Sequence, residues 1–99
     1  MSQPANRAFY TLDGDLRLTG ASPNTLRLWG KTWREVQGRK LVEVFPFTEN
    51  GPVHQALDEA LRSFQPKRLK VDSQFVGKPV EVEIYPVREG VQVSFGPIG

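Results

Sequence analysis

The chain has 99 residues, which fits one domain with a single core, and 38% of them are hydrophobic, as in globular rather than disordered proteins. It contains no cysteine, which excludes disulfide bonds, thiolate nucleophiles, cysteine metal ligands and a flavin–cysteinyl adduct. The net charge is only +2 and the basic residues are interleaved with apolar ones, so we expect a solvated surface and no nucleic-acid partner.

The N-terminal residues, MSQPANRAFY, contain no apolar signal core, and no apolar run in the sequence is long enough to span a bilayer. We therefore expect no membrane insertion and a cytoplasmic location. We also expect residues 1–7 to be an N-terminal extension and residues 8–99 to form a single domain.

A β-hairpin is predicted near residues 8–12 and 16–21. AFYTL is rich in strand formers, DLRLTGA alternates apolar and polar residues, and Asp13–Gly14 lies between the two segments. Asp-Gly between such runs is a strong hairpin signal, because both residues of a two-residue turn of this kind need positive φ.

Three short helical segments are predicted next. The first has Ser22 as its N-cap and stops at Gly30, and the second opens with a capping box formed by Thr32 and Glu35. The third, KLVEVFP, is closed by Pro46.

Segments this short are stable only when they pack against something larger. We therefore expect Trp29 and Trp33, which lie in or next to them, to be largely buried.

One longer helix is predicted to begin at Asn50 or Gly51, with Pro66 following its end. Its apolar residues recur with helical spacing and form a single stripe: Val53, Ala56, Leu57, Ala60, Leu61 and Phe64.

Three strands complete the chain, in the segments KRLKVD, PVEVEIYPV and GVQVSF. Their period-two alternation predicts an antiparallel sheet with one buried face. The expected order is therefore β-β-α-α-α-α-β-β-β. This is an α+β fold, in which several short helices and one longer helix cover one face of a five-stranded antiparallel sheet.

The order and spacing of these phrases resemble a PAS domain over nearly the whole chain. TLDGDLRLTGASP is similar to the opening hairpin of that family, and LWGKTWREVQGRKLVEVFP to its hydrophobic-Gly step, short helix and Phe-Pro turn. PVHQALDEALRSFQP is similar to the family's long helix, and VEVEIYPV to its penultimate strand.

The chain departs from the family pattern at two places. Ser22 stands where the family often has Asn between the second strand and the first helix, and serine also caps helices. Many members end in Asp-Ile-Thr, which couples the domain to a following signalling helix. Here Ile98 is flanked by Pro97 and Gly99.

The resemblance implies a sensory or regulatory module of a signal-transduction protein, such as a histidine kinase or a cyclase. Such a module acts by sensing a ligand, by dimerising, or by both. A ligand-free docking or dimerisation domain is the alternative. The expected partners are a second copy of the chain and an attached or partner signalling domain.

The sequence gives no indication of an enzyme. It has no glycine-rich phosphate loop ahead of a helix and no His-x-x-His or Glu-x-x-His metal spacing, so we predict no catalytic residues, no metal site and no cofactor. His54 supports a minor alternative, since some family members bind haem through a histidine on or near the long helix. It lies at the edge of the apolar stripe, and a surface histidine is the simpler interpretation.

Two groups of residues are candidates for binding. Large residues are expected to converge on the interior, where they either line a pocket or fill it, and we lean towards a closed core. This pocket or core group is Trp29, Trp33, Phe45, Leu57, Leu61, Phe75, Val82 and Val93. The other group is a predicted dimer face on the outer side of the sheet: Phe9, Tyr85, Gln92 and Ser94.

Overall fold

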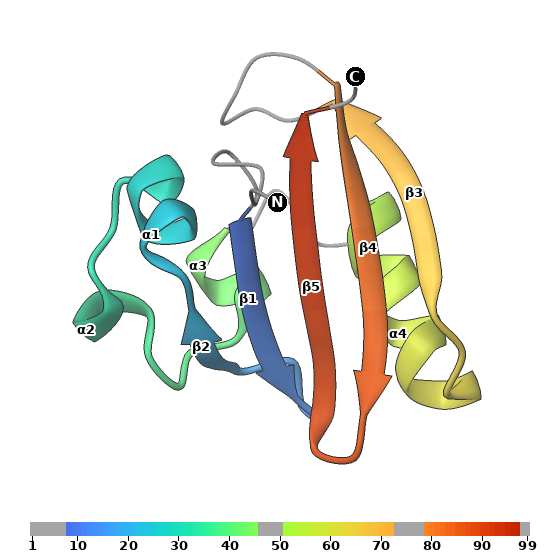
Figure 1. The fold of residues 1–99 in the computed structure, drawn as a ribbon. Coiled ribbons are helices and arrows are strands. Elements are labelled where there is room, and N and C mark those ends of the chain that lie inside the picture. Colours follow the sequence, from blue (N-terminus) through green and yellow to red (C-terminus); the bar gives the residue numbers. More distant parts are fainter. Residues whose placement is uncertain (1–7, 46–50, 73–78, 98–99) are drawn as a thin grey trace, which may run out of the picture.

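The computed structural model of the chain describes residues 8–45, 51–72 and 79–97 (Figure 1). The element order is the predicted one. The strands are β1 Ala8–Asp13, β2 Leu18–Ala21, β3 Lys67–Asp72, β4 Pro79–Val87 and β5 Gly90–Pro97. The helices are α1 Pro23–Trp29, α2 Trp33–Val36, α3 Leu41–Val44 and α4 Pro52–Ser63.

The five strands form one antiparallel sheet in the order β2-β1-β5-β4-β3. β1 and β5, from opposite ends of the chain, therefore lie side by side in its middle (Figure 1). Their register places Phe9 opposite Ser94, and the β4–β5 register places Tyr85 opposite Gln92.

One face of the sheet, the inner face, is covered by helices. α4 lies behind β4 and β3 in Figure 1 and contacts both strands, and α1 contacts β1. Alternate strand residues point to this face and are buried, which confirms the period-two prediction for the last two strands. The buried hydrophobic residues of β1, β4 and β5 are Ala8, Tyr10, Leu12, Val80, Val82, Ile84, Val91, Val93 and Phe95.

Four aromatic rings join the short helices to the sheet. The ring centroids of Trp29 and Phe45 are 5.0 Å apart, those of Tyr10 and Trp29 5.2 Å, and those of Tyr10 and Phe95 6.0 Å. The tilted and edge-on geometries are those that aromatic pairs prefer. Burial raises the pKa of the Tyr10 phenol, so this ring stays neutral at any ordinary pH.

The short helices are held by their caps. The Ser22 hydroxyl accepts a hydrogen bond from the Thr25 N–H, and the predicted capping box of Thr32 and Glu35 is present. Hydrogen bonds from the Thr32 N–H and hydroxyl lower the pKa of the Glu35 carboxyl. Gly30 ends α1 in the left-handed conformation, with φ of 67°.

The two tryptophans are not buried to the same degree. Trp29 is 8% exposed and belongs to the core, as predicted. Trp33 opens the four-residue helix α2 and is only partly buried, packing against the core from its edge.

The β1–β2 connection differs from the predicted two-residue turn. Leu16, rather than Asp13 or Gly14, has the positive φ, at 62°. One Asp13 carboxylate oxygen accepts hydrogen bonds from the N–H groups of Asp15 (2.9 Å) and Arg17 (3.0 Å). The Asp13 N–H donates to the Arg17 carbonyl at 3.0 Å, which closes a loop of three residues that ends at Leu16, and such loops place their positive φ at the last position.

The long helix ends one residue before the predicted apolar stripe does. α4 begins after Gly51 and stops at Ser63, and Phe64 is its C-cap with φ of 55°. Phe64 is 61% exposed, so it does not belong to the buried stripe. The left-handed cap turns the chain toward β3 and carries the Phe64 side chain away from the core.

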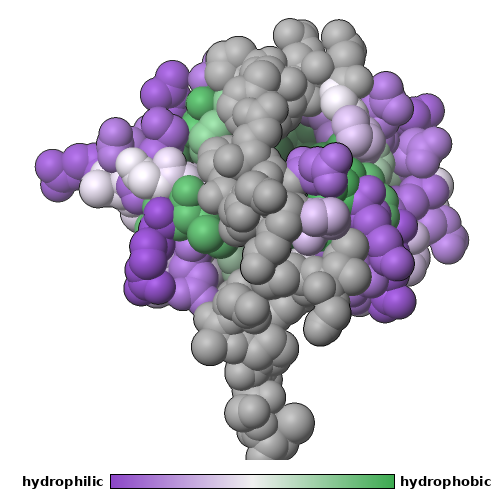
Figure 2. Space-filling model, turned by 90° about the horizontal axis from the view of Figure 1, so that it is seen from above, coloured by the Kyte–Doolittle hydropathy of each residue, from purple (hydrophilic) through white to green (hydrophobic). Residues whose placement is uncertain are grey.

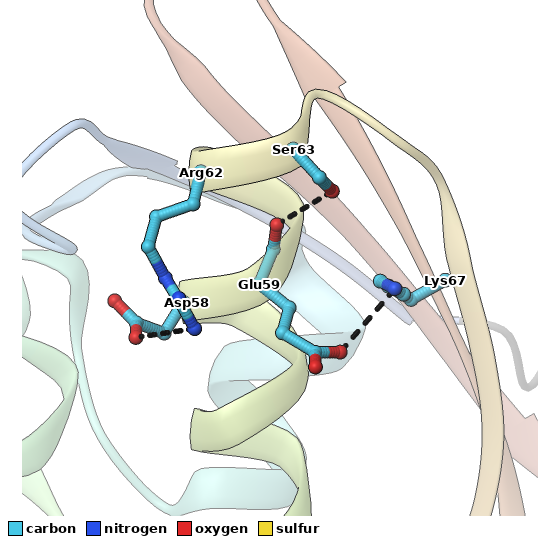
Figure 3. Close-up of polar contacts among 5 residues, drawn as sticks. All are labelled: Asp58, Glu59, Arg62, Ser63 and Lys67. Carbon is cyan, nitrogen blue, oxygen red and sulfur yellow. Dashed lines mark hydrogen bonds and ion pairs between the residues drawn. The ribbon is translucent and has the colours of Figure 1, made fainter.

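Charged contacts connect the end of α4 to β3 (Figure 3). Arg62 pairs with Asp58 one helical turn earlier at 3.3 Å, and Lys67 of β3 reaches Glu59 at 3.3 Å. The Ser63 hydroxyl donates to the Glu59 carbonyl at 2.8 Å. Both ion pairs are open to solvent, so each adds at most about 1 kcal/mol, and only the Lys67–Glu59 pair joins the helix to β3.

Figure 2 shows the described surface from above. Hydrophilic residues lie along both flanks of this view, and hydrophobic residues are visible nearer its centre. No helix within the described residues has the length and apolar character needed to cross a lipid bilayer.

Candidate functional site

The outer face of the sheet carries the candidate site. In Figure 1 the helices α3 and α4 lie behind the strands, so the viewer looks onto this face. It bears a hollow with a volume of about 360 Å³, which we call the outer-face hollow. The hollow is lined by Phe9, Tyr10, Thr11, Glu83, Tyr85, Gln92, Val93 and Ser94.

All four residues of the predicted dimer face line the outer-face hollow. The strand register brings them together, because Phe9 lies opposite Ser94 and Tyr85 opposite Gln92. Phe9 is 50% exposed and Tyr85 43% exposed. Of the three large hydrophobic side chains that are exposed in the described part of the chain, two therefore border this one hollow.

The hollow has a polar edge on the β4 side. One carboxylate oxygen of Glu83 accepts a hydrogen bond from the Tyr85 hydroxyl at 3.2 Å, and the other lies 3.0 Å from the Arg68 guanidinium. The Glu83 carboxylate raises the pKa of Arg68. These contacts hold the Tyr85 ring beside the hollow.

β1 and β5 contribute no charged side chain to the lining of the hollow. Gln92, Ser94 and Thr11 are their polar side chains at the hollow, and the Thr11 hydroxyl lies 2.8 Å from that of Thr19 on β2. On the β4 side, Glu83 pairs across the strands with Arg68 of β3. The hollow is thus a mainly uncharged surface with aromatic sides and one paired carboxylate.

Glu83 and Thr11 share the outer face with the predicted dimer residues, as alternation within β4 and β1 predicts when β1 lies beside β5. The sequence did not identify Arg68 as a partner of Glu83 in this site. The available signal was the alternation of β3 and β4, which places both charged residues on the same face once the two strands are paired.

The predicted interior residues that the structure describes are buried or partly buried, and their role in ligand binding stays a prediction. Five are buried in the core cluster: Trp29, Phe45, Leu57, Val82 and Val93. Trp33 and Leu61 pack against that cluster and are partly buried. Phe75 lies outside the described residues.

His54 lies in the first turn of α4 and is partly buried. Within the described ranges, no group of three or more histidine or carboxylate side chains is arranged to hold a metal ion. Haem ligation through His54 stays the minor alternative.

We expect His54→Ala to leave both the fold and the absorption spectrum of the purified protein unchanged, because a partly buried first-turn histidine contributes little packing. Far-ultraviolet circular dichroism and a visible spectrum test this. A Soret band in the wild type that disappears in the variant would contradict it and identify a haem sensor.

Comparisons with a family model and with solved structures indicate the same fold. A sequence model described as the PAS fold matches residues 3–94. A comparison with curated proteins found no match.

Solved structures of PAS domains are similar to this chain. The PAS domain of the histidine kinase ThkA is 25% identical, with 91% of this chain and 97% of that chain covered and a TM-score of 0.76. A sensory box sensor histidine kinase from Vibrio cholerae is 14% identical, with 96% and 84% covered and a TM-score of 0.84. The PAS domain of the Cronobacter turicensis quorum-sensing receptor RpfR, in complex with BDSF, is 14% identical, with both chains fully covered and a TM-score of 0.76.

The family match covers most of the chain, and the five-stranded sheet with helices on one face agrees with the solved structures. The chain therefore belongs to the PAS fold family.

Proposed function

We propose that the chain is a regulatory module of a signal-transduction protein, such as a histidine kinase or a cyclase, and that it acts by protein–protein contact through the outer-face hollow. The partner that fits best is a second copy of the chain. The module carries no catalysis of its own, and any catalytic activity belongs to an attached or partner signalling domain.

The observation that carries this proposal is the placement of Phe9 and Tyr85. Two half-exposed aromatic rings border one hollow, and the single carboxylate that lines it, that of Glu83, is paired with Arg68. Aromatic residues are enriched at protein interfaces and charged residues are depleted from their centres. In a symmetric dimer the same patch serves both protomers, which a self-complementary aromatic hollow allows.

Ligand sensing in the interior is the second candidate function. The similar PAS domain of RpfR is described in complex with BDSF, so a domain of this fold binds a ligand in that protein. In this chain the rings of Tyr10, Trp29, Phe45 and Phe95 pack against one another between the helices and the sheet. Because these contacts fill that part of the interior, we place the main function at the surface.

Tyr85→Glu is expected to weaken the homodimer about tenfold or more, since losing an aromatic residue at an interface centre commonly costs at least 1–2 kcal/mol. The new carboxylate also lies near Glu83 and adds repulsion to the lost contact. Sedimentation equilibrium over a concentration series measures the change in Kd.

Two variants serve as controls. Tyr85→Phe keeps the ring and removes only the hydrogen bond to Glu83, so it should retain most of the dimer affinity. Gln65→Glu adds the same charge at an exposed position in the connection between α4 and β3, and it should have no effect. A wild type that stays monomeric at high micromolar concentration would show that this face is not a homodimer interface.

A further inference from the structure

Ser22 links the sheet to helix α1 in an unusual way. Its N–H donates to the Phe9 carbonyl at 2.9 Å, which extends the β1–β2 ladder by one pair. Its own carbonyl accepts from the Leu26 N–H at 3.1 Å, as the first turn of α1 requires. The Phe9 N–H therefore pairs with the Ser22 side chain instead, at 3.1 Å from Oγ.

Thr25 closes the same network. It is 0% exposed, and its hydroxyl donates to the Phe9 carbonyl at 2.6 Å. Since that hydrogen is used, the 3.0 Å contact between the two hydroxyl oxygens is a bond donated by Ser22 to Thr25. The Thr25 N–H also donates to the Ser22 hydroxyl, at 3.3 Å.

Both backbone polar groups of Phe9 are therefore fixed by the first turn of α1. The side chain of Phe9 points to the other face of the sheet, where it borders the outer-face hollow. α1 ends at Trp29, which lies in the aromatic core. One seven-residue helix thus has one end bonded to a residue of the contact surface and the other end in the core.

We infer that Ser22 and Thr25 are positioning residues of the outer-face hollow, which hold Phe9 in register for contact with a partner and attach that surface to helix α1. This inference rests on the proposed function for its effect on dimerisation. In an ordinary pair of strands, only backbone hydrogen bonds would hold Phe9. Here the half-buried hydroxyl of Ser22 and the buried hydroxyl of Thr25 also bond Phe9 to α1, a helix that packs on the inner face. Closed hydrogen-bond networks of this kind fix a single geometry, because breaking one member leaves its partners unsatisfied.

The test compares Ser22→Ala and Thr25→Val with a matched control. Thr32→Ala also removes a helix cap, on α2, but the side-chain hydrogen bonds of Thr32 are made with Glu35, and Thr32 does not line the hollow. Thr25→Ser keeps the hydroxyl and serves as the conservative rescue. Amide hydrogen exchange by NMR reports on Phe9 directly, and sedimentation equilibrium reports on dimer affinity.

In Ser22→Ala we expect the Phe9 amide to exchange at least about tenfold faster, because its acceptor is lost, with the Val93 amide in β5 as the internal reference. We expect Ser22→Ala and Thr25→Val to raise the dimer Kd about tenfold. Thr32→Ala and Thr25→Ser should keep both readouts near those of the wild type.

The possible failures are distinguishable. If the dimer Kd of Thr25→Val equals that of Thr32→Ala, the positioning role of Thr25 is wrong, and the proposed function still stands. A monomeric wild type would contradict the proposed function, and the exchange of the Phe9 amide would then decide whether Ser22 holds this residue. Unchanged exchange in Ser22→Ala would overturn the inference in either case.

Discussion

Trp29→Ala is expected to lower the free energy of unfolding by about 3–5 kcal/mol, the range observed when a large buried aromatic residue is truncated. Trp29 is 8% exposed and its ring lies 5.0 Å from that of Phe45 and 5.2 Å from that of Tyr10. The variant removes the ring that joins α1 to both α3 and the sheet. Because α1 and α3 are too short to be stable alone, the cavity cannot close without loosening them.

Chemical denaturation monitored by far-ultraviolet circular dichroism measures this loss. Trp33→Ala is the matched control, because Trp33 is the same residue type in a short helix but is only partly buried. We expect a clearly smaller loss for Trp33→Ala. Equal losses, or a Trp29→Ala midpoint near that of the wild type, would contradict the role of the aromatic core.

Gly90→Ala is expected to lower the free energy of unfolding by about 3 kcal/mol or more, at the upper end of the cost of overpacking. Gly90 begins β5 and lies opposite Asp13. A Cβ atom at this position would overlap the Leu12 carbonyl oxygen and would lie 2.7 Å from the Asp13 Cα atom. These are backbone atoms of the neighbouring strand, so the central β1–β5 pair would have to separate.

Gly14→Ala is the control, because a Cβ there would meet nothing within 4 Å. Denaturation of both variants by urea tests the contrast between them. If Gly90→Ala unfolds at the same urea concentration as Gly14→Ala, the close approach of β1 and β5 is not as the structure describes it.

Much of the fold could be predicted because its local signals agree with the tertiary structure. Alternation in β4 identified the buried face, as Val82 and Ile84 show, and Ser22 and Gly30 bounded α1 correctly. The order of elements then followed, since turn and cap residues separate each segment from the next.

Two predictions from side-chain patterns were wrong because the backbone conformation at those positions differs from the one that the pattern implies. Phe64 continues the helical spacing of the apolar stripe, but periodicity carries no information on φ, and the residue caps the helix instead. Asp13–Gly14 has the composition of a tight turn. The Asp13 carboxylate binds two N–H groups further along the loop, which moves the positive φ to Leu16.

The candidate site was only partly accessible from the sequence. The outward direction of Tyr85, Gln92 and Ser94 follows from alternation within their own strands. Placing Phe9 in the same site requires the knowledge that β1 pairs with β5, and no local sequence pattern encodes that pairing. The link from Ser22 to Phe9 required the β1–β2 register, so the sequence could identify Ser22 only as a helix cap.

The central position of β1 also affects how the protein folds. β1 pairs with β5 from Ala8 opposite Phe95 to Asp13 opposite Gly90, so these contacts join segments at nearly the full separation that the chain allows. Bringing distant segments together has a large entropic cost, and proteins rich in such contacts fold slowly. During synthesis, β1 and the short helices emerge first and have no completed sheet to pack on. The buried side chains Tyr10, Leu12 and Trp29 therefore stay exposed to solvent until β5 has been made, and the newly synthesised chain is most prone to aggregate in that interval.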